Sequence, residues 1–97
     1  MTALLENADA PDAIVCASDT LALGAHRAAL AAAGAGRPAT VVGFDATPVA
    51  EALGLVSVAQ PIDQAAHLCI DLLASRWETP DRPARGLLVP PVLHVPT

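Results

Sequence analysis

Polar side chains directly follow two apolar stretches that have the length of buried β-strands. Ser18 and Asp19 come after residues 13–17, and Asp45 comes after residues 40–44. In an open parallel sheet, ligands bind beyond the carboxyl ends of the strands, where neighbouring loops converge and helix amino termini point. A hydroxyl and carboxylates held there can donate and accept hydrogen bonds to a polyol or a similar polar molecule. The same residues would equally serve as a helix cap and a turn, and the two roles can coexist.

The stretches around these residues predict a β-α-β unit. Residues 13–17 are continuously apolar, which is typical of a strand buried on both faces. Ser18 and its neighbours supply capping side chains for a helix over the alanine-rich residues 21–33, which should end near Gly34 or Gly36. Residues 40–44 are then the second strand, with Asp45 immediately past its carboxyl end.

The rest of the chain predicts further short elements. Thr47 and Pro48 suit the N-cap and first residue of a helix that ends before Gly54, and residues 55–59 suit a third strand. Residues 62–77 carry a polar stripe opposite the apolar Ile62, Ala66, Cys69, Leu73 and Trp77, which indicates an amphipathic helix that needs a surface to lie on. Residues 86–95 suggest a strand, but the prolines at 90 and 91 place it at an edge or a bulge.

Composition excludes several classes of protein. The chain has 97 residues, of which 54% are hydrophobic and 15% charged, as expected for one folded domain at most. The formal net charge of -5 gives no basic footprint for nucleic acid, and two cysteines cannot make a disulfide scaffold. No apolar run approaches the roughly 20 residues of a membrane span, and the first residues lack the basic start of a signal peptide. We therefore expect a cytoplasmic chain with no membrane partner.

Catalytic and metal-binding patterns are missing from the sequence. His26, His67 and His94 are not spaced with cysteines or acids as metal ligands are, so we expect no metal site. No nucleophile motif and no phosphate-binding loop is present, so we expect no catalytic residue, no cofactor and no enzymatic activity. The enzyme alternative would use Asp19 or Asp45 as a general base, for which the sequence offers no partner.

Four ordered segments give the chain a family resemblance. Residues 11–25 resemble the P-x-A-I-x-x-x-N-D-x-x-A-x-G-A stretch of LacI/GalR-type transcriptional regulators. The sequences Val-Val-Gly-Phe-Asp at 41–45, Gln-Pro-Ile at 60–62 and Leu-Leu-Val-Pro-Pro-Val-Leu at 87–93 are similar to three further landmarks of that family, in the same order. The resemblance implies an α/β fold: a truncated, partial Rossmann-like three-layer parallel sheet of the periplasmic binding protein type I.

The resemblance also implies a domain organisation and a function. Residues 1–97 would form a single partial effector-binding domain, with β-α-β units of the carboxyl-terminal lobe at 11–59, and the crossover, a helix of the other lobe and terminal strands at 60–97. In such regulators a small effector, commonly a sugar or a purine, binds between the lobes and the protein forms a homodimer. DNA would be contacted only by an amino-terminal helix-turn-helix domain that this chain lacks. The implied ligand-binding residues are Ser18, Asp45 and Gln60.

Three departures from the family pattern concern this site. Ser18 stands where the family usually has an asparagine, and a serine has a shorter reach and fewer donors. Ala46 stands where a second acid is frequent, and the segment from Asp45 to Gln60 is about two residues shorter than usual. The effector and the geometry of this region are therefore open.

Two other interpretations remain. A solute-binding protein of an ABC uptake system shares the fold, and the chain could also be a remnant without independent function. Because half of the expected cleft is missing, we expect the isolated chain to bind sugars weakly or not at all.

Overall fold

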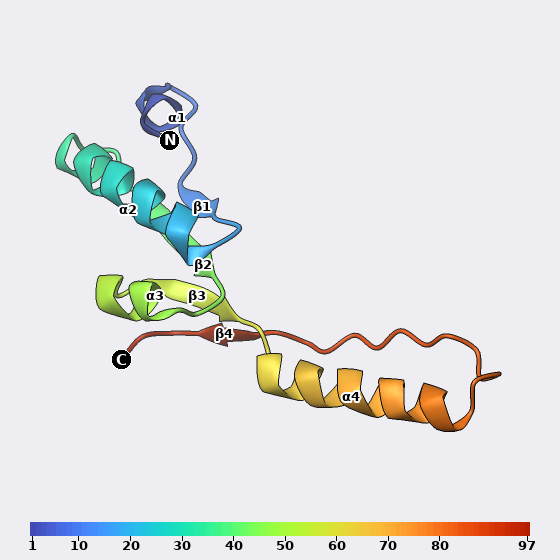
Figure 1. Cartoon of the computed structure of the whole chain (residues 1–97). Helices are drawn as coiled ribbons and strands as arrows, with labels where there is room; N and C mark the ends of the chain where they lie inside the picture. The colour runs from blue at the N-terminus through green and yellow to red at the C-terminus, as the bar shows by residue number, and fades with distance from the viewer. The chain divides into compact units, whose positions relative to one another are not determined.

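Figure 1 shows the computed structural model, which describes all residues, 1–97. The chain divides into two compact units: the first comprises Met1–Ala59 and Leu93–Thr97, and the second comprises Gln60–Val92. The elements, in chain order, are α1 (Thr2–Glu6), β1 (Ala13–Val15), α2 (Asp19–Gly34), β2 (Thr40–Phe44), α3 (Pro48–Leu53), β3 (Val56–Ala59), α4 (Ile62–Glu78) and β4 (Val92–His94).

A four-stranded sheet in the order β1-β2-β3-β4 organises the first unit. β1 pairs with β2 in parallel, with Ile14 opposite Val41, and β2 pairs with β3 in parallel, with Gly43 opposite Ser57. The carboxyl ends of β1, β2 and β3 therefore lie at the same edge of the sheet. This arrangement confirms the expected α/β class with a parallel sheet.

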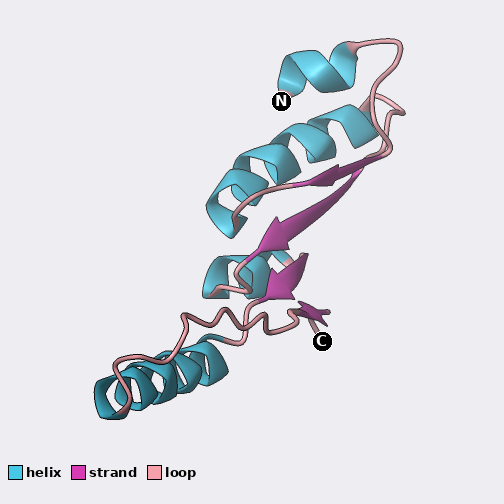
Figure 2. Cartoon of the chain, turned by 90° about the vertical axis from the view of Figure 1, so that its right-hand side faces the viewer, coloured by secondary structure: helices cyan, strands magenta, loops and turns pink.

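Helices α2 and α3 pack on each other, and α2 packs along β2, as the view in Figure 2 shows. Along β2, Val41 and Gly43 are buried while Thr40, Val42 and Phe44 are less so, which is the period of two expected when one face of a strand is covered. The buried side of α2 consists of the small residues Ala22, Ala25, Ala29 and Ala32. Their small side chains let the helix approach the sheet closely.

Two expectations for strands are wrong in detail. β1 ends at Val15 and is not buried on both faces. Ala13 and Val15 lie on one face and are exposed, with Val15 73% exposed, while Ile14 on the other face is half-buried, so one face of this strand is left uncovered. The final strand covers only Val92–His94 rather than residues 86–95. Pro90 and Pro91 have no N–H to donate to a neighbouring strand, so regular pairing begins only after them.

The predicted helix boundaries that depend on local chemistry are confirmed. Ser18 is the N-cap of α2, and its Oγ accepts a hydrogen bond from the Leu21 N–H at 3.1 Å. Beyond the end of α2, Gly36 adopts the left-handed conformation with φ 81°, and Gly54 does the same after α3 with φ 68°. Glycine is favoured at both positions because it has no Cβ to oppose a positive φ.

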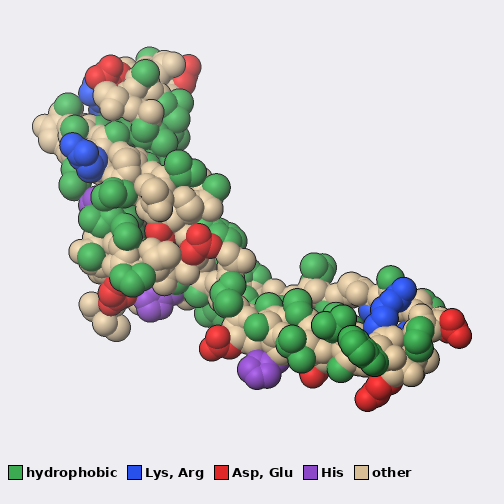
Figure 3. All heavy atoms as spheres, viewed as in Figure 1, with side chains coloured by type: hydrophobic (Ala, Val, Ile, Leu, Met, Phe, Trp, Pro, Cys, Tyr) green, Lys and Arg blue, Asp and Glu red, His purple; other side chains and the backbone are tan.

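In the second unit, α4 has the predicted amphipathic pattern but no buried residue. Ile62, Ile70, Leu73 and Trp77 are all exposed, and Trp77 is 82% exposed. Figure 3 shows hydrophobic side chains at the surface along this helix. The apolar side of α4 is thus not covered within the second unit. None of the helices is both long enough and apolar enough to span a bilayer.

Candidate functional site

Two of the three predicted ligand-binding residues stand at the carboxyl edge of the sheet. Ser18 follows β1 and is partly exposed; Asp45 follows β2 directly and is exposed. Because the two strands are parallel neighbours, Ser18 and Asp45 belong to adjacent loops at the same edge. Gln60 is exposed, follows the last residue of β3 and is the first residue of the second unit. We call Ser18 and Asp45 the rim residues.

Behind the rim lies a buried carboxylate. Asp19 is the first residue of α2 and only 1% exposed. Its Oδ1 accepts a hydrogen bond from Ser57 Oγ at 2.7 Å, and its Oδ2 accepts two from Thr47: one from the backbone N–H at 2.6 Å and one from Oγ1 at 2.7 Å. We call Asp19, Thr47 and Ser57 the clasp. A buried charge is tolerated when hydrogen-bond donors surround it, and here all the donors are neutral.

Ser57 links the clasp to the next loop residue. It lies in the middle of β3 with no exposed surface, because the alternation of the strand turns it toward the helices. While donating to Asp19, Ser57 Oγ also accepts a hydrogen bond from the Ala46 N–H at 2.9 Å. No buried side-chain nitrogen or oxygen of the chain lacks a partner.

Gly43 makes room for this arrangement. A Cβ at this position would overlap Asp19 Oδ1 and would lie 3.3 Å from Asp19 Cγ and 3.4 Å from Ser57 Oγ. Any larger residue in the middle of β2 would therefore push the carboxylate out of its place. This explains a glycine inside a strand, where it otherwise weakens packing.

The loop that carries Asp45 has an unusual backbone. Asp45 has φ 98° and Ala46 has φ 51°, a region that residues with a Cβ rarely adopt. Three consecutive N–H groups of this loop donate to fixed acceptors: Asp45 to the Val58 carbonyl at 2.8 Å, Ala46 to Ser57 and Thr47 to Asp19. The surrounding hydrogen bonds thus hold a conformation that the loop residues do not themselves favour.

Two opposing effects act on the pKa of Asp19. Burial raises the pKa, because it penalises the charged form. The hydrogen bonds from the side chains of Ser57 and Thr47 and from the backbone at Thr47 and Phe44 favour the charged form and outweigh burial, so the pKa is lowered below its ordinary value of 3.8. Asp19 is therefore ionised at neutral pH.

Sequence reasoning did not connect the clasp residues to one another. It placed Asp19 at the end of a strand and the start of a helix, as a cap or a possible polar contact, assigned Thr47 to an N-cap, and did not single out Ser57. Thr47 does precede α3, but its side chain makes no capping bond and donates to Asp19 instead. The available signals were Gly43 inside a strand and a serine between two valines at an inward-facing strand position.

Two hollows lie near polar groups. In the first unit, a hollow of about 530 Å³ is lined by Ala46, Thr47, Pro48, Glu51 and Ala52, so it borders the Asp45 loop.

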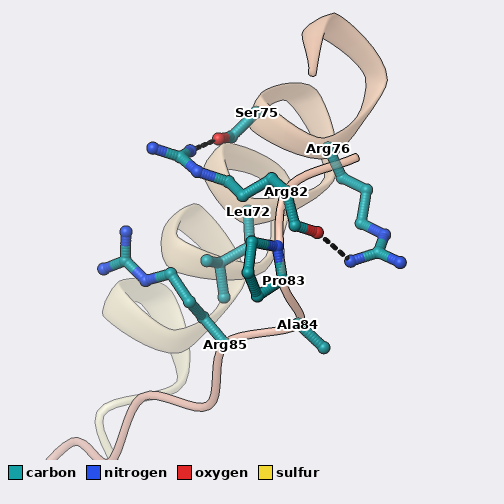
Figure 4. Close-up of a pocket in the computed structure, with 7 residues that line it drawn as sticks. All are labelled: Leu72, Ser75, Arg76, Arg82, Pro83, Ala84 and Arg85. Atoms are coloured by element: carbon teal, nitrogen blue, oxygen red, sulfur yellow. Dashed lines mark hydrogen bonds between the residues drawn. The ribbon is translucent and has the colours of Figure 1, made fainter. Parts of the chain in front are cut away.

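In the second unit, a pocket of about 160 Å³ is lined by Leu72, Ser75, Arg76, Arg82, Pro83, Ala84 and Arg85 (Figure 4). There Arg76 donates to the Arg82 carbonyl and Arg82 donates to Ser75 Oγ, so these guanidinium groups tie the loop back to α4. None of the predicted ligand-binding residues lines this pocket.

Comparisons with known proteins agree with this architecture. The crystal structure of a probable transcription regulator from Thermus thermophilus is 33% identical in sequence with a TM-score of 0.64, and the match covers 87% of this chain and 33% of that one. The chain therefore spans about a third of the length of that regulator. A search of curated proteins gives no significant match. Residues 1–95 match the periplasmic binding protein-like domain, and the chain belongs to that family.

Proposed function

We propose that the chain is the effector-binding segment of a LacI-type transcriptional regulator and that it contacts a small polar molecule, of the sugar class, through Ser18 and Asp45. The observation that carries this proposal is the placement of both residues after adjacent parallel strands at one edge of the sheet. Ligands of open α/β sheets bind at this edge. Gln60 is a proposed third contact from its place in the family resemblance.

The chemistry of the rim favours a ligand rich in hydrogen-bond donors. Asp45 brings an exposed carboxylate, which can accept from two adjacent hydroxyl groups of a sugar, and Ser18 adds a hydroxyl. The N–H groups of residues 45–47 already donate hydrogen bonds within the protein, so they do not form an anion-binding site. A neutral polyol fits these groups better than a phosphorylated one.

The regulatory role follows from the relatives of the chain. The similar Thermus thermophilus structure is a probable transcription regulator, and the chain matches about a third of it. We infer that the whole protein is a cytoplasmic, non-enzymatic homodimer that contacts DNA through another domain. Effector binding would then change DNA affinity through a coupling free energy between the two sites.

A titration of the ¹⁵N-labelled 97-residue chain with D-ribose, D-glucose and D-galactose tests the binding site. We expect chemical-shift changes at the amides of Ser18, Asp45 and their neighbours that saturate at millimolar sugar, which corresponds to about 4 kcal/mol. Binding should be weak because the chain supplies only part of the expected cleft. Saturation at micromolar sugar would contradict that expectation of weakness. Sugar-induced shifts that appear elsewhere but not in the rim loops, for example only around the arginine-lined pocket of Figure 4, would refute the proposed site.

A further inference from the structure

We propose that Asp19 is the positioning residue of the rim: through the clasp it holds the loop 45–47, in which residues 45 and 46 have positive φ, and so fixes the direction of Asp45. The proposal deepens the proposed function, on which it rests for the role of Asp45 as a ligand contact. Asp19 itself need not touch the ligand, because it is buried.

The clasp joins three segments that are distant in sequence. Asp19 is covalently next to Ser18, so it lies in the loop that carries one rim residue. Its Oδ2 accepts hydrogen bonds from the backbone N–H and the hydroxyl of Thr47, which lies in the loop that carries the other rim residue. Its Oδ1 accepts a hydrogen bond from the hydroxyl of Ser57 in β3. One carboxylate therefore connects the two rim loops to each other and to the neighbouring strand.

Helix capping does not account for these contacts. Ser18 already caps α2 through the Leu21 N–H. The hydrogen bonds of the Asp19 carboxylate all go to residues outside α2, at positions 47 and 57 and at the backbone of Phe44. The contacts made by Asp19 thus serve the loop after β2 rather than the helix that Asp19 begins.

The strained backbone gives the clasp a specific task. The Asp45 N–H is held by the Val58 carbonyl, as a continuation of the pairing between β2 and β3. The next two N–H groups, of Ala46 and Thr47, are held by Ser57 Oγ and Asp19 Oδ2, which are both clasp atoms. Without those acceptors, Asp45 and Ala46 would relax toward the negative φ values that side chains with a Cβ prefer. The carboxylate of Asp45 would then point elsewhere.

The test uses solution NMR of the 97-residue chain and three variants, Ser57→Ala, Thr47→Val and Asp19→Asn. The φ-sensitive HN–Hα couplings and Cα shifts of residues 45 and 46 report the loop conformation, and amide exchange at 46 and 47 reports the hydrogen bonds. We expect Ser57→Ala and Asp19→Asn to abolish the positive-φ signature and to raise exchange at these amides at least about tenfold, with a smaller rise for Thr47→Val. The β2 amides at 41 and 42 should stay protected.

Two controls separate positioning from general loss of structure. Thr40→Val makes the same substitution as Thr47→Val at an exposed position of β2, and should leave the loop signals unchanged. Ser57→Thr keeps a hydroxyl at the clasp and should restore the couplings that Ser57→Ala loses. If Asp19→Asn does not fold, the Ser57 pair and Thr47→Val still decide the question.

Outcomes for the clasp and for the proposed function can be told apart. If residues 45 and 46 keep the wild-type couplings and protection in Ser57→Ala, the proposal is wrong, because something else holds the loop. If D-ribose, D-glucose or D-galactose shifts the rim amides, Ser57→Ala should raise the Kd at least about tenfold, and an unchanged Kd would also overturn it. If a sugar shifts amides only outside the rim loops but Ser57→Ala still releases the loop, the clasp stands and only the proposed function fails.

Discussion

At the scale of single residues, the unusual feature is a buried carboxylate that has no cation beside it. Asp19 is stabilised by donors from Thr47 and Ser57, and these hydrogen bonds lower its pKa despite its burial. Neutral donors achieve this because hydrogen bonds to a charged acceptor are stronger than those between neutral groups. Under the proposal above, the direction of Asp45 depends on this arrangement although Asp45 does not belong to it.

Ser57→Ala tests the contribution of the clasp to stability. It removes the donor to Asp19 Oδ1 and leaves the half-buried Ala46 N–H without its acceptor. We expect the free energy of unfolding of the first unit to fall by about 2 to 3 kcal/mol, as measured by urea denaturation followed by circular dichroism. The control Ser75→Ala alters a half-buried serine of α4 whose hydroxyl accepts from Arg82. Because Ser75 belongs to the second unit, this substitution should change the free energy of unfolding of the first unit by less than about 0.5 kcal/mol. Equal effects of the two substitutions would show that the clasp adds no stability.

Asp45→Asn tests the rim directly. Asparagine keeps the shape of the side chain and tolerates a positive φ nearly as well as aspartate, so the melting temperature should stay within about 2 °C of wild type. One carboxylate oxygen is replaced by an amide donor, so an acceptor for sugar hydroxyls is lost. In the NMR titration, we expect the Kd obtained from the shifts of the rim amides to rise at least about tenfold. Unaltered sugar-induced shifts would remove Asp45 from the site.

At the scale of elements, the approach of α2 to β2 determines the geometry of the site. The buried side of α2 is formed largely by alanines, and Asp19 Oδ1 occupies the space that a Cβ at Gly43 of β2 would need. Small residues on both elements allow a charged group at the start of the helix to reach the middle of the sheet. The distance between the two rim loops is therefore set by how closely this helix and this strand pack.

Gly43→Ala tests this close approach. The added Cβ would overlap Asp19 Oδ1, and both the strand and the start of the helix would have to shift, so we expect a loss of about 3 kcal/mol in unfolding free energy. Gly24→Ala is the opposing control, because it lies in α2 with no atom near its Cβ position. Alanine there should increase stability by up to about 1 kcal/mol. Thermal melts compare the stabilities of both variants with wild type. If Gly43→Ala leaves the stability unchanged, Asp19 does not pack tightly against Gly43.

The elements also show which features a sequence can reveal. The cap at Ser18, the strand at 40–44 and the glycines after α2 and α3 depend on neighbours a few residues away, and all were predicted correctly. The burial of β1 was predicted wrongly, because a strand's apolar composition does not tell whether other elements cover both of its faces. The clasp was missed because Asp19 meets Thr47 and Ser57 across 28 and 38 residues. Such contacts arise only once the strands are paired in register.

At the scale of the whole molecule, stability is concentrated in the first unit. All of the buried hydrophobic residues belong to it, and most are small: Leu5, Cys16, Ala22, Ala25, Ala29, Ala32, Val41, Ala50 and Leu55. α4 in the second unit buries none of its residues. A core made largely of alanine contributes little hydrophobic free energy per residue, so a buried polar network is a larger share of the total than in most domains.

Acid should therefore unfold the first unit through Asp19. Its pKa is lowered in the folded state relative to the ordinary value of 3.8, so the unfolded chain binds the proton more readily. The stabilisation is present in full above pH 3.8 and is lost as the pH falls through the lower, folded-state value. Urea unfolding of the wild type between pH 7 and pH 2 should show a free energy of unfolding that declines below about pH 3.8. Asp19→Asn cannot be protonated in this range, so its decline should be shallower, whereas the exposed-site control Asp12→Asn should follow the wild type. Parallel pH profiles for wild type and Asp19→Asn would mean that the ionised carboxylate of Asp19 does not contribute to folding.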